Sequence, residues 1–198
     1  MVILIGGAGC VGKTLMAQNL LERYKIPYLS IDHIKMGIYR GLFNCGFTPE
    51  SEDKIITKQI WPVIKGVIMT NIENEQNIIV EGCYFPEYIE GEFDKEYLSK
   101  IVFLHILFSE AYIRKNFLKK IMKNRNIIEN RIDEFKYSNE AMEEYIIENK
   151  NNKEKCTRNG IKYFEIQEDY NKEIQIAYKW INDKINVIKD GEVRPRFA

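Results

Sequence analysis

The sequence has little that would support a fold held together by disulfides or metal ions. Its four cysteines, Cys10, Cys45, Cys83 and Cys156, are scattered without a C-x-x-C pair, and there are only two histidines. Neither a disulfide framework nor a structural zinc site is therefore expected. This cysteine usage indicates a reducing compartment, and we expect a cytoplasmic protein.

The chain also lacks an excess of charge and a long apolar run. Its 29 Lys and Arg residues balance 29 Asp and Glu residues, so no overall field favours nucleic acid or an acidic membrane. No apolar stretch approaches the length of a membrane helix, and Met1–Ile5 is too short for a signal-peptide core. We expect a monomer or homodimer that binds neither nucleic acid nor membranes.

What the sequence does contain is a regular alternation of short apolar runs and helical patterns. At 198 residues the chain fits one domain, 1–198, and is too short for separate cofactor and substrate domains. The alternation predicts an α/β fold whose mainly parallel sheet is covered on both faces, with a ligand crevice at the carboxyl ends of the strands. The predicted strands are Val2–Ile5, Tyr28–Ile31, Ile78–Val80, Ile101–Phe108 and Ile161–Ile166.

Two segments break this rhythm and are expected to be mobile. Gly37–Thr48 is rich in glycine and aromatic residues, and Lys115–Arg131 is basic and leads into a helix capped near Ser138. We expect an acceptor flap over about residues 33–75 and a lid over about residues 115–137, by the rule that helix-breaking and polar stretches mark loops.

Two shorter features also suggest interruptions. Pro62, directly after Trp61, falls inside a long helical pattern, and proline removes a helical hydrogen-bond donor. The polar tract Glu148–Lys155 is interpreted as a solvated turn.

The segment Gly7–Thr14 matches the pattern G-x-x-x-x-G-K-[ST], between a buried strand and an amphipathic helix beginning at Lys13. Glycines let backbone N–H groups turn toward phosphate oxygens, and the helix start adds positive potential. Lys13 is expected to bridge the outer phosphates of ATP and the Thr14 hydroxyl to bind Mg²⁺. The predicted nucleotide-binding residues are Gly7, Ala8, Gly9, Cys10, Val11, Gly12, Lys13 and Thr14.

The same segment fits a second pattern, G-x-G-x-x-G, with Asp32 about 20 residues further on as a ribose-binding carboxylate. An NAD(P)-binding oxidoreductase is therefore an alternative, although a dinucleotide loop gives Lys13 and Thr14 no role. No N-K-x-D phrase is present, so ATP is favoured over GTP.

The sequence GGAGCVGKT, with SIDHIK after the second strand and IIVEG at the third, resembles the small-molecule and nucleotide kinases of the adenylate-kinase-like group. Asp32-His33-Ile34-Lys35 and Val80-Glu81-Gly82 most resemble the 2-phosphoglycerate-kinase-like proteins. The resemblance implies a three-layer α/β/α phosphate-loop fold, a five-stranded parallel sheet of order 2-3-1-4-5, and ATP-dependent phosphoryl transfer with an acceptor flap and a lid.

Two carboxylates are candidates for the chemistry. Asp32 follows the second strand, and in similar kinases an acid here accepts the proton of the attacking hydroxyl; the alternative is a helix N-cap. Glu81 ends the third strand, near the metal ion expected at Thr14. It is expected to bind this ion directly or through a water molecule. Its alternative role is to hold the turn Gly82–Tyr84.

Residues of the expected flap supply the acceptor site. Lys35 and Arg40 would clamp a phosphorylated acceptor, or are simply solvated. Tyr84 lines the acceptor pocket or packs in the core. His33, beside Asp32, is a possible acceptor contact.

The resemblance to these kinases implies that the lid carries arginines that stabilise the transferred phosphoryl group. Arg125 is the first choice, followed by Arg114 and Arg131, with a solvated helix face as the alternative for each. The tight arginine cluster of similar kinases is absent from the sequence. Two further residues receive structural interpretations: His105 as a core histidine with satisfied hydrogen bonds, and Cys10 as a small loop residue.

These residues predict an ATP- and Mg²⁺-dependent kinase acting on a small acceptor: a nucleotide, a nucleoside or a phosphorylated metabolite. A nucleotide-binding regulator or an ATPase without an acceptor is the remaining alternative.

Overall fold

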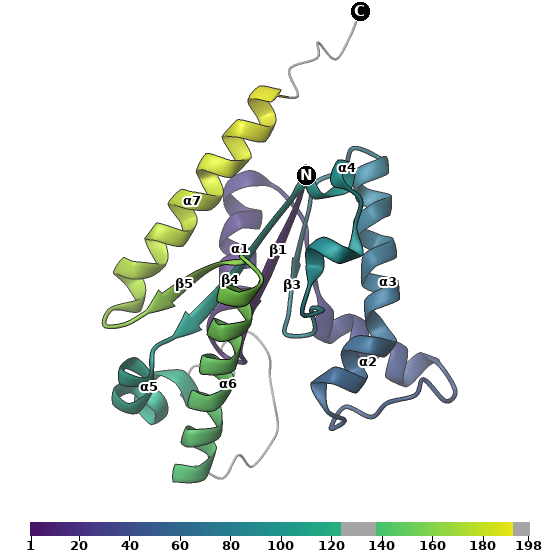
Figure 1. Cartoon of the computed structure of the whole chain (residues 1–198). Coiled ribbons are helices and arrows are strands. Elements are labelled where there is room, and N and C mark those ends of the chain that lie inside the picture. Colours follow the sequence, from purple (N-terminus) through teal and green to yellow (C-terminus); the bar gives the residue numbers. More distant parts are fainter. Residues whose placement is uncertain (124–137, 192–198) are drawn as a thin grey trace, which may run out of the picture.

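The computed structural model describes residues 1–123 and 138–191, with the side chains of 188–191 excepted. Parallel strands alternate with helices along the chain (Figure 1). The elements are β1 (Val2–Gly7), α1 (Lys13–Tyr24), β2 (Tyr28–Ser30), α2 (Ile31–Gly41), α3 (Asp53–Glu73), β3 (Ile78–Glu81), η1 (Ile89–Glu92), α4 (Lys95–Leu98), β4 (Ile101–Phe108), α5 (Glu110–Asn116), η2 (Phe117–Met122), α6 (Asn139–Arg158), β5 (Lys162–Ile166) and α7 (Tyr170–Gly191).

The sheet has five parallel strands in the order β2-β3-β1-β4-β5. β1 is central, and its Ile5 pairs with Glu81 of β3 on one side and Leu104 of β4 on the other. Because all strands run in one direction, their carboxyl ends meet at one edge of the sheet, where the expected crevice lies. The predicted fold and strand order are confirmed.

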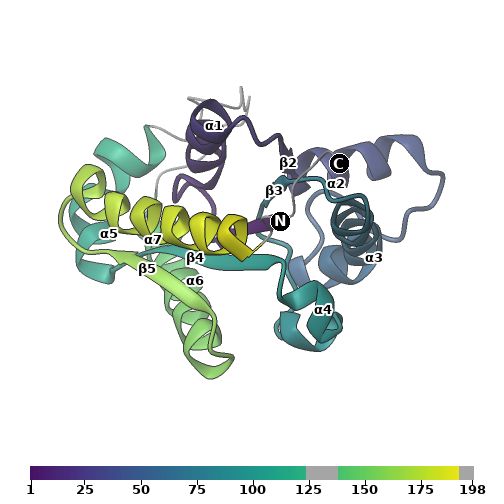
Figure 2. The same cartoon turned by 90° about the horizontal axis from the view of Figure 1, so that it is seen from above.

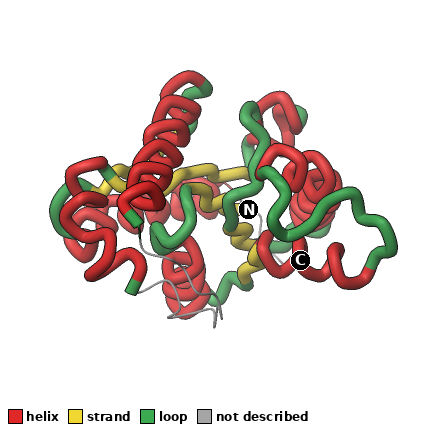
Figure 3. Tube along the Cα trace, turned by 90° about the horizontal axis from the view of Figure 1, so that it is seen from below, coloured by secondary structure: helices red, strands yellow, loops and turns green. Residues whose placement is uncertain are grey.

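Alternate residues of β1 are buried in two different cores, because successive side chains of a strand point to opposite faces. Ile3 and Ile5 pack in a cluster that includes side chains of α1 and α7, whereas Val2 and Leu4 pack in a cluster dominated by α3. Figure 2 shows α1 and α6 on opposite sides of the sheet. Figure 3, a view of the molecule from below, shows helices on both sides of the strands. A strand covered on both faces needs apolar residues throughout, as Val2–Ile5 has.

The predicted interruption at Pro62 is wrong, because α3 continues from Asp53 through Pro62 to Glu73. Pro62 and Lys58 are both exposed. The Lys58 carbonyl, which loses its helical donor to Pro62, is therefore on the solvent side of the helix, where water can satisfy it.

The predicted turn at Glu148–Lys155 is also wrong, because this tract lies inside α6. Only a narrow stripe of α6 is buried, including Tyr145, Ile146 and Asn149. Most of the helix is polar, so the helical spacing of apolar residues is weak in its sequence. The predicted cap is confirmed: the Ser138 hydroxyl accepts a hydrogen bond from the backbone N–H of Ala141.

The expected flap and lid are largely helical where the structure describes them. The first part of Gly37–Thr48 completes α2, and the flap continues through residues 42–52 into α3. The described part of the lid, residues 115–123, holds the end of α5 and the π-helical η2. Arg125 and Arg131 lie outside the described residues. No helix among the described residues is long and apolar enough to cross a membrane.

Candidate active site

A cavity of about 980 Å³ lies at the carboxyl ends of the strands. In Figure 1 the strand arrows point to the edge of the sheet where α2 and α5 lie. The cavity wall combines the phosphate loop with the first turn of α2, the first residue of α3, the end of β3, α5, η2, α6 and the start of α7. Segments from the whole length of the chain therefore meet at one site.

The loop after β1 has the backbone geometry of an anion site. Cys10 has φ 59° and Gly12 has φ 94°, so the chain turns through left-handed conformations just before α1. The first turn of α1 contains no acidic residue, and no side chain caps the helix at Gly12. The N–H groups that begin α1 are thus left for a ligand, and their partial positive charge favours phosphate.

Glycine is required at position 12 for two reasons, the backbone conformation and the close approach of Tyr170. A Cβ at this position would overlap the hydroxyl of Tyr170, the first residue of α7, in addition to straining φ. The α7 start is thereby packed directly against the phosphate loop, so only glycine fits at position 12.

Lys13 is the buried cation of the site. Its side chain is 7% exposed, and Nζ donates hydrogen bonds to the Ala8 carbonyl at 2.7 Å and to Cys83 Sγ at 3.3 Å. Burial lowers the Lys13 pKa, but Cys83, Glu81 and Asp32 outweigh it and the pKa is raised. Burial raises the pKa of Cys83 to about 11, so at neutral pH this neighbour is a thiol and the carboxylates keep Lys13 charged.

Glu81 and Thr14 together fit a hydrated Mg²⁺ ion. Glu81 is 2% exposed, and its Oε1 has no hydrogen-bond partner among the described residues. Burial raises the Glu81 pKa, while Lys13 and contact with the Thr14 hydroxyl lower it. Both residues line the cavity, and an unpartnered buried carboxylate oxygen beside a hydroxyl is a set of donors that Mg²⁺ prefers.

The described residues hold no all-protein metal cage. In residues 1–123 and 138–191, no group of three or more His, Cys, Asp or Glu side chains could hold a metal ion. A magnesium ion that keeps several waters and also binds nucleotide phosphates does not need such a group.

Asp32 enters the cavity from the first turn of α2 and is held by Lys35. The Lys35 ammonium lies 3.1 Å from the Asp32 carboxylate and donates a hydrogen bond of 2.9 Å to the Tyr84 hydroxyl. Burial lowers the Lys35 pKa, but Tyr84 and Asp32 outweigh this and raise it. The N-cap of α2 is Ser30, without a side-chain cap bond, so the structure shows Asp32 in an ion pair rather than in a cap.

Several residues at this site were not predicted from the sequence. Asp53 begins α3, Glu148 comes from α6, Asp169 directly precedes α7, and Tyr170 and Asn171 begin that helix; all five line the cavity. Tyr145, also on α6, donates a hydrogen bond of 2.6 Å to the Gly9 carbonyl. The apolar pair Tyr145 and Ile146 was the available signal that a helix, and not a turn, runs through this tract.

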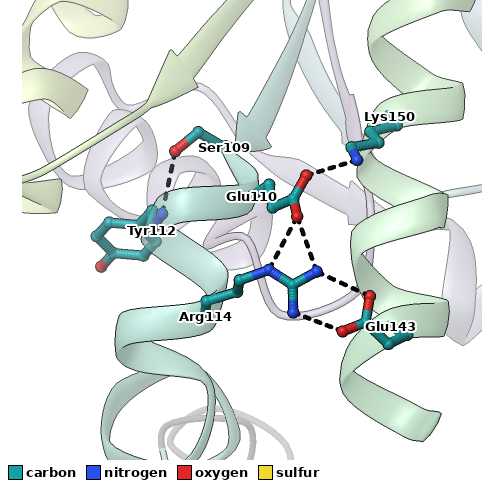
Figure 4. Close-up of polar contacts among 6 residues, drawn as sticks. All are labelled: Ser109, Glu110, Tyr112, Arg114, Glu143 and Lys150. Carbon is teal, nitrogen blue, oxygen red and sulfur yellow. Dashed lines mark hydrogen bonds and ion pairs between the residues drawn. The ribbon is translucent and has the colours of Figure 1, made fainter. Parts of the chain in front are cut away.

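The structure does not place Arg114 or Arg40 in the cavity wall. Arg114 forms an exposed ion-pair cluster that joins α5 to α6 (Figure 4). Its guanidinium contacts Glu110 and Glu143, and Lys150 contacts Glu110 in turn. Within the described chain, these charges neutralise one another away from the phosphate loop.

His105 is a core histidine, but the prediction that its hydrogen bonds are satisfied is wrong. It is 3% exposed, and neither ring nitrogen has a partner among the described residues. The ring fills the space above Gly6 and lies edge-on to Phe103. Burial lowers the His105 pKa to about 3, so the ring is neutral at physiological pH. His33 lines the cavity beside Asp32.

The sheet order disfavours the dinucleotide alternative. In dinucleotide-binding folds the first strand is a neighbour of the second. Here β1 lies between β3 and β4, and β2 is at the edge.

The comparisons with known proteins give the fold. No protein-family model and no curated protein sequence matches this chain. Among solved structures, the shikimate kinase of Bacteroides thetaiotaomicron is 13% identical, with a TM-score of 0.57 over 92% of this chain and 98% of that one. The shikimate kinase of Aquifex aeolicus is 14% identical, with a TM-score of 0.52 over 93% and 98%. The chain thus has the three-layer fold of these kinases.

Proposed function

We propose that this protein transfers the γ-phosphoryl group of ATP to a hydroxyl group of a small acceptor. The observation that carries the proposal is the meeting, in one cavity, of an uncapped glycine loop at a helix start, the buried Lys13, the pair Thr14 and Glu81, and the carboxylate of Asp32. Each element of this set has a role in phosphoryl transfer and little use in a purely structural turn.

The loop amides and Lys13 hold the phosphates and neutralise the charge that develops on the transferred group. Asp32, oriented by Lys35, accepts the proton of the acceptor hydroxyl. The acceptor oxygen forms a bond to the γ-phosphorus, the bond from that phosphorus to the β–γ bridging oxygen breaks, and ADP leaves with the electron pair. Positioning and electrostatic stabilisation supply the rate, because no covalent enzyme intermediate is needed.

Thr14 and Glu81 would hold Mg²⁺, with Glu81 binding it directly or through water. When bound, this ion neutralises charge on the β- and γ-phosphate oxygens. Asp169, directly before α7, and the first two residues of that helix, Tyr170 and Asn171, line the cavity. In this proposal they contact the base and sugar of the nucleotide.

The sequence resemblance to 2-phosphoglycerate-kinase-like proteins and the role of Arg125 as a lid residue are part of the same proposal. The first rests on Asp32–Lys35 and Val80–Gly82, and the second on the position of Arg125 after the fourth strand in the sequence, outside the described residues.

Replacing Lys13 with methionine keeps much of the side-chain volume and removes the charge. We expect phosphoryl transfer to fall by at least about a hundredfold, since electrostatic stabilisation is the main term in this chemistry. The control is Lys58→Met, an exposed residue of α3. Full activity of Lys13→Met, or MgATP binding too weak to stabilise the unsubstituted protein, would refute the proposal.

The alternative function is that of an ATPase that has no acceptor other than water. ADP formation that needs no metabolite would favour it, whereas ADP formation only with a hydroxyl compound favours the kinase.

A further inference from the structure

Both polar backbone groups of Gly9, in the phosphate loop, are held by one turn of α6. The Tyr145 hydroxyl donates a hydrogen bond of 2.6 Å to the Gly9 carbonyl, and the Glu148 carboxylate accepts a hydrogen bond from the Gly9 N–H. Tyr145 and Glu148 are three residues apart, so they lie on the same side of the helix. The second contact places a negative charge on the loop that is expected to bind phosphate.

This turn of α6 is fixed to the sheet by Asn149, which is 2% exposed. The Asn149 side chain accepts a hydrogen bond of 2.9 Å from the backbone N–H of Phe108, at the end of β4, and donates one of 2.9 Å to the Tyr145 carbonyl. Buried polar groups that are satisfied in this way hold a segment in one position. A departure of the Glu148 carboxylate from Gly9 therefore needs rotation of its own side chain and no movement of the helix.

Glu148 acts on the centre of the phosphate site as well as on Gly9. It is half-buried and lines the cavity together with Lys13 and Cys83, and its charge raises the pKa of the Cys83 thiol. Burial and Asp53 raise the Glu148 pKa, whereas the Lys13 ammonium and the Gly9 N–H favour the ionised form and lower it. The carboxylate thus neutralises part of the positive charge that the loop offers to phosphate.

The space beside Gly9 is open to a ligand. A Cβ built at Gly9 would meet no atom within 4 Å beyond its chain neighbours, in contrast to Gly12. Phosphate oxygens and the Glu148 carboxylate are negatively charged acceptors for the same N–H, so they compete for this part of the loop. Two such charges side by side in a partly buried site are unfavourable.

We propose that Glu148 is a specificity-determining residue of the phosphate site: its carboxylate binds the Gly9 N–H in the nucleotide-free protein and excludes inorganic phosphates from the loop. The inference rests on the proposed function, because it concerns the same loop. A nucleotide displaces the carboxylate because its base and sugar add contacts that inorganic phosphates lack. Selection between the two ligands then comes from a repulsive group as well as from attractive ones.

The test compares the binding of tripolyphosphate without magnesium and of MgATP to the unsubstituted protein and to Glu148→Gln. Calorimetry at about pH 8 keeps the carboxylate ionised. Glutamine has the same length and keeps an oxygen that accepts from the Gly9 N–H, but it has no charge. We expect Glu148→Gln to bind tripolyphosphate at least about tenfold more tightly, because repulsion between charges a few ångströms apart is lost. The gain for MgATP should be smaller, since magnesium reduces the charge of the phosphates.

The control is Glu154→Gln, which removes the same charge from an exposed position of α6 outside the cavity wall. It should bind both ligands as the unsubstituted protein does, and an equal gain in Glu154→Gln would attribute the effect to net charge and overturn the proposal. Thermal unfolding verifies that Glu148→Gln is folded, and Glu148→Ala takes its place if it is not. Damage to the loop would weaken binding, so tighter binding reports the lost repulsion.

The two ligands also separate this inference from the function on which it rests. If the unsubstituted protein and Glu148→Gln both fail to bind MgATP, the proposed function itself is wrong. If MgATP binds but Glu148→Gln binds tripolyphosphate no more tightly than the unsubstituted protein, or gains equally for both ligands, Glu148 does not select between them. The inference is then wrong and the kinase proposal stands.

Discussion

The hydroxyl of Tyr145, in the first half of α6, donates a hydrogen bond of 2.6 Å to the carbonyl oxygen of Gly9 in the phosphate loop. Tyr145 is buried, and burial raises its pKa well above the usual value, so the phenol keeps its proton. The bond joins a helix from the second half of the chain to the loop that follows β1. The conformation of the loop therefore depends on the position of α6.

Tyr145→Phe removes this bond and leaves the Gly9 carbonyl without its phenol donor. We expect the free energy of unfolding to fall by about 1 kcal/mol and the KM for ATP to rise severalfold, since a buried acceptor loses its partner. Chemical denaturation and steady-state kinetics would measure the two effects. Tyr88→Phe, at an exposed tyrosine, is the control. A stability loss with an unchanged KM for ATP would show that the bond supports the fold alone.

Glu81→Gln should stabilise the ligand-free protein and remove its response to magnesium. Because burial raises the Glu81 pKa, its contribution to stability is full below the unfolded value, near 4.5, and is lost as pH rises through the folded value. Glutamine does not ionise, so the stability of the variant relative to the unsubstituted protein should increase as pH rises from about 4.5 toward 7.

Thermal unfolding with and without MgATP measures both parts of this prediction. The exposed Glu144→Gln, on α6, should behave like the unsubstituted protein. A Glu81→Gln protein that MgATP still stabilises as strongly as the original would show that Glu81 has no part in metal binding.

His105 should make the protein sensitive to acid. Its folded pKa of about 3 lies below the ordinary value of 6.5, so the unfolded chain binds a proton first as pH falls. The stability that the neutral ring contributes is present above pH 6.5 and is lost as pH decreases toward 3. His105→Leu should therefore lose less stability than the original protein over this range.

Denaturation midpoints at several pH values would reveal the difference between the two curves. His33→Gln, at an exposed histidine on the cavity wall, should retain the full acid sensitivity. Parallel pH curves for His105→Leu and the original would mean that His105 is not the titrating group.

Arg114→Gln should lower stability only slightly, because exposed ion pairs contribute little. The guanidinium bridges Glu110 and Glu143 on the surface (Figure 4), so kcat should stay within about twofold of the original, well below the effect of a phosphate-contacting arginine. The stability difference should shrink in high salt. A kcat reduced a thousandfold would instead support the lid role expected from the sequence.

The fold and the phosphate loop could be predicted because their signals are local. Val2–Ile5 has no polar residue, as a strand buried on both faces requires, and Gly12, Lys13 and Thr14 stand in a fixed spacing that the loop mechanism demands. Glu81 and Asp32 could be placed as well, because parallel strands put the residues that follow them at one edge.

The rest of the cavity wall depends on tertiary contacts that spacing does not reveal. Glu148 lies in a run of polar residues where Tyr145 and Ile146 give only a weak helical signal, and Asp53 becomes a cavity residue only because α3 begins beside α2. Arg114 looked like a lid residue by its position after β4, whereas two nearby carboxylates fix it on the surface. Burial of His105 against Gly6 likewise follows from strand pairing.

The contact between Gly12 and the Tyr170 hydroxyl has a consequence for biosynthesis. The ribosome makes the loop well before the residues that contact it, Tyr145 and Tyr170. The loop of a nascent chain therefore lacks these contacts until Tyr170 has been translated. Contacts so distant in sequence slow folding, and a product shortened before residue 170 would lack the part of the cavity wall that α7 supplies.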